Sequence, residues 1–227
     1  PRTSRMVASP SGSRSATLYS ALCDAIDRHG RGYRVLEDIR RVEYRYQDFL
    51  KMVLMLTRLV ERAAPQSGAG TSIGLLLPNA APTVALIFGL SARGRTPAML
   101  NYTAGPDAVR DACTAAGIRT VVTSRRFVHL GKLDATVKAL VFTRAVMGDV
   151  QPSDTAVVLF TSGSEAHPKG VAISHDAMLS NMAQMRAVID FGPGDRYLNA
   201  LPMYHTYGLT ACTLMPLMSG VPLFLYT

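Results

Sequence analysis

Short apolar runs alternate with helix-like segments along the middle of this chain, and this rhythm constrains its fold more than any other feature. The runs that read as buried strands are Ser72–Leu77, Thr96–Leu100, Arg119–Thr123, Ala139–Phe142 and Ala156–Phe160. Two helix-like segments, Ala80–Ala92 and Pro106–Ala116, separate the first of these runs. Continuous apolar strands alternating with helices are typical of βαβ units, in which both faces of a sheet are covered. Right-handed crossovers then predict an α/β fold, a doubly wound and largely parallel sheet with helices on both faces.

Another group of elements precedes this alternation. Leu18–His29 has helical periodicity and ends at Gly30, while Tyr33–Ile39 and Val42–Tyr46 predict two short strands around a charged turn. Gln47–Ala64 is the clearest helix, because its apolar residues recur on one face of a 3.6-residue period. These residues are Phe49, Val53, Leu56 and Val60.

The start of the chain differs in composition from the rest. Residues 1–16 are rich in Ser, Arg and Pro and contain no apolar run, and Pro1 stands where an initiator Met would be expected. We interpret residues 1–16 as a flexible linker that follows another part of a longer polypeptide. Residues 17–227 are then expected to form the N-terminal part of a single large domain, incomplete at its C-terminal end.

Charge and cysteine content exclude several classes of protein. The net charge of +8 comes from basic residues that are scattered along the chain, without a like-charge block or interleaved aromatics, so a nucleic-acid partner is not expected. Cys23, Cys113 and Cys212 are odd in number and lie among apolar neighbours. We therefore predict buried, reduced thiols and neither a disulfide framework nor a zinc site.

The C-terminal stretch from Tyr197 to Thr227 is nearly uncharged and long enough to raise the question of a membrane span, which needs about 20 apolar residues. Proline and glycine interrupt it repeatedly, at Pro202, Pro216, Gly220 and Pro222. A short helix followed by a buried strand, Val221 to Tyr226, fits this pattern better, and no transmembrane segment is expected.

The segment that follows the apolar run Ala156–Phe160 has the composition of a polyphosphate-binding loop. Its hydroxyl side chains belong to Thr161, Ser162 and Ser164. Gly163 would let backbone amides approach an anion closely, and Lys169 adds a mobile point charge suited to phosphate oxygens. Loops at the carboxyl ends of parallel strands are where α/β sheets bind their ligands. The alternative is an ordinary Ser/Gly-rich turn with Lys169 in solvent.

This loop does not follow the common nucleotide-binding pattern, in which Gly-Lys is followed directly by a hydroxyl residue, since Pro168 precedes Lys169 and Gly170 follows it. It instead resembles the phosphate-binding signature of the adenylate-forming superfamily, Thr-Ser-Gly-Ser/Thr-Thr-Gly-x-Pro-Lys-Gly. Two positions depart from that signature. Glu165 replaces the usual Thr, as in the acyl-carrier-protein synthetase branch, and Ala166 replaces the usual Gly. If the loop needs a positive φ there, Ala166 would cost roughly 1 kcal/mol or more.

A second motif supports the same resemblance. The segment from Leu201 to Leu209 is similar to the superfamily motif Leu-Pro-x-aromatic-His-x-x-Gly-Leu, which borders the channel for the acyl substrate. The resemblance implies that His205 lies in the substrate pocket, where we expect it to orient the acid rather than to transfer a proton. Without the motif, His205 would be read as a core histidine bonded to a carbonyl.

The stretch from Arg95 to Gly105 looks like the ligase half of bacterial bifunctional acyl-acyl-carrier-protein synthetase/2-acylglycerophosphoethanolamine acyltransferases. That resemblance implies a fatty acid as substrate, ATP and Mg²⁺ as cofactors, and an acyl carrier protein or CoA thiol as acceptor. The phosphates of ATP would be held by Thr161, Ser162, Gly163, Ser164, Glu165 and Lys169. It also implies a cytoplasmic protein, with the parent at the bacterial inner membrane.

The later superfamily motifs that bind adenine, ribose and Mg²⁺ are not found in these residues, and no metal-ligating residue is assigned among them. We therefore expect the chain alone to be inactive. Two other functions remain open: a degenerate nucleotide- or partner-binding module, and a ligase for another carboxylic acid.

Overall fold

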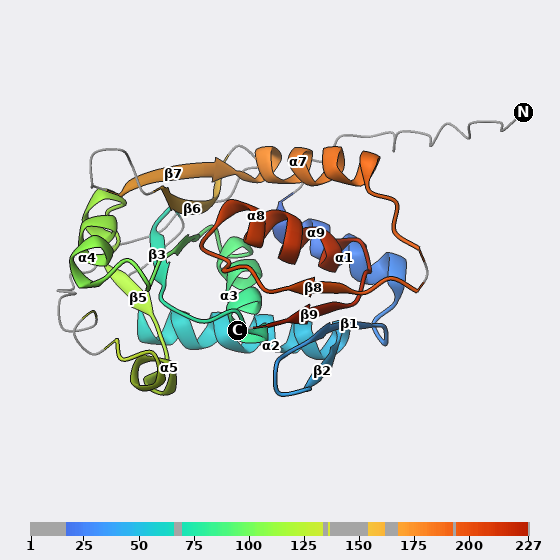
Figure 1. Ribbon diagram of the computed structural model, residues 1–227, viewed down its shortest axis with the longest axis horizontal. Coiled ribbons are helices and arrows are strands. Elements are labelled where there is room, and N and C mark those ends of the chain that lie inside the picture. Colours follow the sequence, from blue (N-terminus) through green and yellow to red (C-terminus); the bar gives the residue numbers. More distant parts are fainter. Residues whose placement is uncertain are drawn as a thin grey trace, which may run out of the picture.

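The computed structural model describes residues 17–65, 70–133, 136, 154–161, 168–192 and 194–226. Within these ranges the chain forms two β-sheets with helices packed around them (Figure 1). The helices are α1 (Leu18–His29), α2 (Tyr46–Ala63), α3 (Ala81–Ser91), α4 (Pro106–Ala115), α5 (Arg125–Leu130), α7 (His175–Val188), α8 (Thr206–Leu209) and α9 (Met215–Met218). The strands are β1 (Arg34–Glu37), β2 (Glu43–Arg45), β3 (Ser72–Leu75), β4 (Thr96–Met99), β5 (Thr120–Val122), β6 (Thr155–Thr161), β7 (Lys169–Ser174), β8 (Tyr197–Asn199) and β9 (Leu223–Leu225).

The larger sheet has the strand order β5-β3-β4-β6-β7. Strands β3, β4, β5 and β6 run parallel, with Gly74 of β3 opposite Ala98 of β4 and Ala98 opposite Val158 of β6. Strand β7 returns antiparallel to β6 as a hairpin. The predicted α/β fold with a largely parallel sheet is therefore confirmed, and β7 is the one reversed strand among the described strands of the larger sheet.

Alternate side chains of the strands enter two separate cores, one on each face of the larger sheet. Ile73 and Leu75 of β3 are 1% exposed and belong to the main core, which also contains the buried faces of α1, α2 and α3. Ala98 and Val158 point the other way and pack with Val109 of α4. Helices therefore cover both faces of the sheet, as the alternating pattern predicts.

The smaller sheet joins the two ends of the chain in the order β2-β1-β9-β8. Leu36 of β1 lies opposite Leu223 of β9, and β8 pairs with β9 in parallel. Above this sheet in Figure 1, α8 and α9 are joined by a π-helical turn, Thr210–Leu214. This second sheet is not apparent from the sequence, because it pairs strands almost 190 positions apart.

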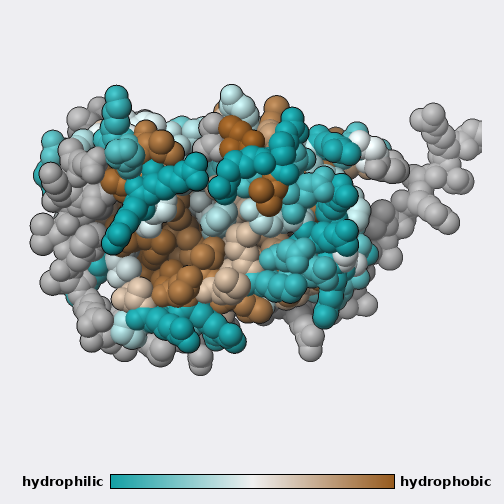
Figure 2. All heavy atoms as spheres, turned by 90° about the horizontal axis from the view of Figure 1, so that it is seen from below, coloured by the Kyte–Doolittle hydropathy of each residue, from teal (hydrophilic) through white to brown (hydrophobic). Residues whose placement is uncertain are grey.

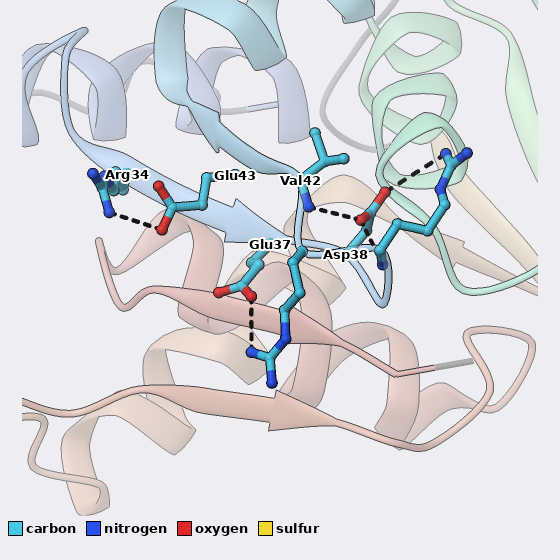
Figure 3. Close-up of polar contacts among 7 residues, drawn as sticks. Arg34, Glu37, Asp38, Val42 and Glu43 are labelled. Atoms are coloured by element: carbon cyan, nitrogen blue, oxygen red, sulfur yellow. Dashed lines mark hydrogen bonds and ion pairs between the residues drawn. The ribbon is translucent and has the colours of Figure 1, made fainter.

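The β1–β2 hairpin is closed by the buried carboxylate of Asp38. It accepts hydrogen bonds from the backbone N–H groups of Arg40 at 2.9 Å and Val42 at 3.1 Å (Figure 3). Ion pairs flank this turn, Arg34 with Glu43 at 2.7 Å and Arg41 with Glu37 at 3.0 Å. Some of the arginines that contribute to the positive net charge thus form ion pairs with nearby carboxylates.

Several sequence-based expectations are modified by the structure. Helix α1 has the predicted bounds, whereas the six-residue helix α5 was not expected. Of the cysteines predicted to be buried, Cys113 and Cys212 are buried but Cys23 is half-buried, and all three are free thiols. Burial raises the pKa of the Cys113 thiol to about 11, so it is an unreactive structural residue. The linker 1–16 and the predicted strand Ala139–Phe142 lie outside the described residues.

Candidate active site

The β6–β7 hairpin brings together the two ends of the predicted phosphate-binding loop. Thr161 is the last residue of β6 and Lys169 the first of β7, and the two face each other as the final pair of the hairpin. Both side chains are exposed. Ser162, Gly163, Ser164 and Glu165 lie in the intervening part of the chain, outside the described residues. A hydroxyl donor and an ammonium group therefore flank the loop at the carboxyl end of a central strand.

The second motif lies after β8, and its backbone is held by Asn79. The side-chain Nδ2 of Asn79 donates to the carbonyl oxygen of Leu201 at 2.7 Å, and its Oδ1 accepts from the N–H of Met203 at 2.9 Å. Asn79 is only 6% exposed and follows β3 at the carboxyl edge of the larger sheet. This side chain therefore links the larger sheet to the segment 201–209.

Gly208 explains why the segment can turn so tightly into α8. A Cβ atom at Gly208 would lie 2.3 Å from the carbonyl oxygen of Pro202, which is closer than real carbon atoms approach. The carbonyl of Gly208 accepts from Thr213 Oγ1 at 2.8 Å and from Asn199 Nδ2 at 3.2 Å. The glycine of the motif is thus a packing requirement of this segment.

His205 is exposed and lies at the N-terminal end of α8, beside Tyr204. The centroids of the two rings are 4.7 Å apart. Tyr204 itself is 8% exposed and makes an edge-to-face contact with Tyr102, whose ring centroid lies 5.2 Å away. Burial, with a smaller contribution from Tyr204, raises the pKa of Tyr102, so the Tyr102 ring is a neutral phenol at physiological pH.

The turn that contains Tyr102 lies next to the β6–β7 hairpin. Asn101 and Ala104 line a small cavity of about 200 Å³ together with Thr161 and Pro168. Neither Asn79 nor this turn was predicted to take part in the site. Their positions directly after strands β3 and β4, at the sheet edge where ligands bind, are the signal that could have indicated them.

A larger apolar hollow lies elsewhere on the molecule. It has a volume of about 880 Å³ and is lined by the C-terminal half of α2, by Leu86 and by residues 119–123. Viewed from below, Figure 2 shows hydrophobic atoms gathered in this hollow. Thr161, Lys169 and His205 are not among its lining residues, so this hollow is separate from the candidate site.

Among the described residues, no cluster of three or more His, Cys, Asp or Glu side chains could hold a metal ion. No helix in the part of the chain that the structure describes is long and apolar enough to cross a membrane.

Comparison with known proteins identifies the family. The family model described as AMP-binding enzyme matches residues 25–227, most of the chain. The chain belongs to the AMP-binding enzyme family. A sulfoacetate–CoA ligase of Cupriavidus necator is 30% identical over 182 residues, which cover 70% of this chain and 35% of that protein. The chain thus spans about a third of the length of that relative.

Two further similarities are to a curated ligase and to a solved structure. The medium-chain-fatty-acid–[acyl-carrier-protein] ligase TtuA of Teredinibacter turnerae is 34% identical over 74 residues, 33% of this chain and 12% of that protein. The inhibitor-bound N-terminal domain of FACL13 from Mycobacterium tuberculosis superposes with a TM-score of 0.78 at 21% identity, covering 92% of this chain and 57% of that chain. The structural match shows that this chain shares the fold of that N-terminal domain.

Proposed function

We propose that the protein containing this chain is an AMP-forming acid–thiol ligase that activates a fatty acid. In the first step, a carboxylate oxygen attacks the α-phosphorus of ATP and the bond to pyrophosphate breaks, which gives an acyl-adenylate. In the second step, the thiol sulfur of an acyl carrier protein or CoA attacks the acyl carbon, AMP leaves and the thiol proton goes to solvent. The observation that carries this proposal is the pairing of Thr161 with Lys169 at the end of β6 in an AMP-binding chain.

The residues at this hairpin fit a polyphosphate. The Thr161 hydroxyl and the Lys169 ammonium supply a hydrogen-bond donor and a positive charge at the loop ends, and we assign Ser162, Gly163, Ser164 and Glu165 to the same phosphate-binding loop. Fixed donors and cations stabilise the charge that develops as pyrophosphate leaves, which is usually the largest contribution to catalysis of this kind. Mg²⁺ bound to the ATP phosphates would neutralise part of that charge.

His205 and Tyr204 are assigned to the acid-binding side. His205 is exposed beside a buried aromatic ring, so its imidazole can orient a carboxylate that lies against Tyr204. The fatty-acid assignment is supported by the similarity to the acyl-carrier-protein ligase TtuA and by the stretch Arg95–Gly105. We extend it to a bifunctional parent that also acts as a 2-acylglycerophosphoethanolamine acyltransferase at the cytoplasmic side of the bacterial inner membrane.

Another acid is the second candidate, because the sulfoacetate–CoA ligase matches a longer part of the chain. A binding module without ligase activity is the third, and it rests on Ala166 in the loop.

The test is ATP–pyrophosphate exchange by the full-length protein with palmitate, decanoate, sulfoacetate or 4-coumarate. Exchange that depends on palmitate or decanoate is the expected result. Exchange with sulfoacetate or 4-coumarate alone would keep the ligase and overturn the fatty-acid assignment. A folded protein that exchanges with none of these acids would support the binding module, and Ala166→Gly would then be the first substitution to try.

A further inference from the structure

We propose that Tyr102 and Thr103, in the turn after β4, are positioning residues that fix Tyr204 and thereby the direction of His205. This inference rests on the proposed function, in which segment 201–209 borders the bound acid. It concerns a turn that is distant in the sequence from both substrate-binding motifs, since Thr103 and Tyr204 are 101 positions apart.

The rings form a continuous series of contacts. Phe127 of α5 meets Tyr102 edge to face, with centroids 5.0 Å apart and planes at 85°. Tyr102 meets Tyr204 in the same way, at 5.2 Å and 89°, and Tyr204 lies 4.7 Å from His205. Edge-to-face contacts restrict ring orientation as well as position. A ring held this way on its buried side presents a fixed surface to whatever lies beside His205.

The hydrogen bonds of the same turn determine which hydroxyl donates between Thr103 and Tyr204. Asn101 Oδ1 accepts from the backbone N–H of Thr103 at 3.0 Å and from its hydroxyl at 2.7 Å. A hydroxyl has a single proton, so the Thr103 oxygen can only accept from the Tyr204 hydroxyl, 3.4 Å away. That distance is long for an O–H···O bond, so the ring contact with Tyr102 contributes more to holding Tyr204.

The turn also reaches the phosphate side through Asn101, which shares the 200 Å³ cavity with Thr161 and Pro168. Its backbone therefore lies between the two substrate-binding segments. The Tyr102 ring, in contrast, contacts Tyr204 on the acid side. Removing this ring should weaken acid binding and leave ATP binding largely unchanged.

The experiment measures KM for the acid, KM for ATP and kcat in ATP–pyrophosphate exchange by the full-length protein. Tyr102→Leu removes the ring, Tyr102→Phe keeps it, and Tyr44→Leu is the matched control at another half-buried core tyrosine. The energy of an aromatic pair corresponds to a rise of about three- to tenfold in KM for the acid with Tyr102→Leu. We expect KM for ATP to change less than about twofold, and Tyr102→Phe and Tyr44→Leu to resemble the wild type.

Thermal melting identifies a variant that fails to fold. If Tyr102→Leu does not fold, Thr103→Val is measured in its place. That variant removes the acceptor for the Tyr204 hydroxyl, and we expect an increase of about twofold in KM for the acid. The inference is overturned if KM for the acid rises no more in Tyr102→Leu than in Tyr44→Leu, or if Tyr102→Phe is as impaired as Tyr102→Leu. Where Thr103→Val is used in place of Tyr102→Leu, an unchanged KM for the acid overturns it. A wild type without exchange for any acid of the panel overturns the proposed function, and the inference with it.

Discussion

The side chain of Asn79 accepts a hydrogen bond from the backbone of Met203, 124 positions further along the chain. Its amide nitrogen donates to Leu201 in the same segment, so one buried side chain satisfies two backbone groups. This contact sets the distance between the carboxyl edge of the larger sheet and the segment that carries His205. The position of the segment that carries His205 therefore depends on a side chain that lies outside both candidate motifs.

Asn79→Ala should destabilise the protein, because it removes the partners of a buried N–H and a partly buried carbonyl. Each lost hydrogen bond of this kind costs about 1–3 kcal/mol. Urea unfolding measures the change, and Asn181→Ala, on the exposed surface of α7, is the control with an expected change within about 0.5 kcal/mol. Equal stability of the two variants would show that Asn79 does not hold segment 201–209.

Gly208→Ala should also destabilise the fold, by about 1–3 kcal/mol, because the added methyl group would overlap the Pro202 carbonyl. Gly32→Ala provides the comparison, since an added Cβ there has no atom within 4 Å. Denaturant midpoints of the two variants measure the difference. A Gly208→Ala protein as stable as Gly32→Ala would mean that the turn relaxes without cost.

Lowering the pH below about 6.5 should destabilise the protein through protonation of His175. Its Nδ1 accepts the backbone N–H of Leu18 at 3.1 Å and so anchors α1 to α7. Burial lowers the pKa of His175 below its usual 6.5, while Asp154 and Asp176 act in the opposite direction. The unfolded chain then binds the proton more readily, so this contribution is complete above about pH 6.5 and is lost as the pH falls toward the lower folded-state pKa.

The measurement is the free energy of unfolding between pH 7.5 and pH 5.5 for the wild type and for His175→Asn. Asparagine keeps an acceptor near the Leu18 N–H and removes the titration. The wild type should lose more stability over this range than the variant does. Parallel pH profiles would contradict a lowered pKa at His175.

Local periodicity predicted much of the fold. The bounds of α1 and the position of α2 follow from apolar residues that recur on one face of each helix. The strands β3 to β6 follow from short apolar runs. The pairing of β1 with β9 was not predictable in this way, since the register of Leu36 with Leu223 depends on how the whole chain closes. Helix α5 was missed because none of its residues is buried, which leaves no apolar period to detect.

The candidate site also contains residues that the sequence predicted and residues that only the structure shows. Thr161, Lys169 and His205 were indicated by residue type and motif, and the structure places Thr161 opposite Lys169. The roles of Asn79 and Tyr102 come from contacts between distant segments, and that of Gly208 from its close approach to the Pro202 carbonyl. An asparagine after a proline reads locally as a turn residue, and only the packed structure shows which backbone it binds.

The central claim is that the Thr161–Lys169 end of the hairpin binds the phosphates of ATP, and Lys169→Ala in the full-length protein tests it most directly. The measured quantities are KM for ATP and the rate of acid-dependent ATP–pyrophosphate exchange, with Lys51→Ala on the surface of α2 as the control. We predict a loss of about 10- to 100-fold in the exchange rate at fixed ATP for Lys169→Ala, the range expected for one charge-assisted hydrogen bond, and none for Lys51→Ala. Unchanged exchange in a folded Lys169→Ala protein would contradict the assignment of this hairpin to ATP.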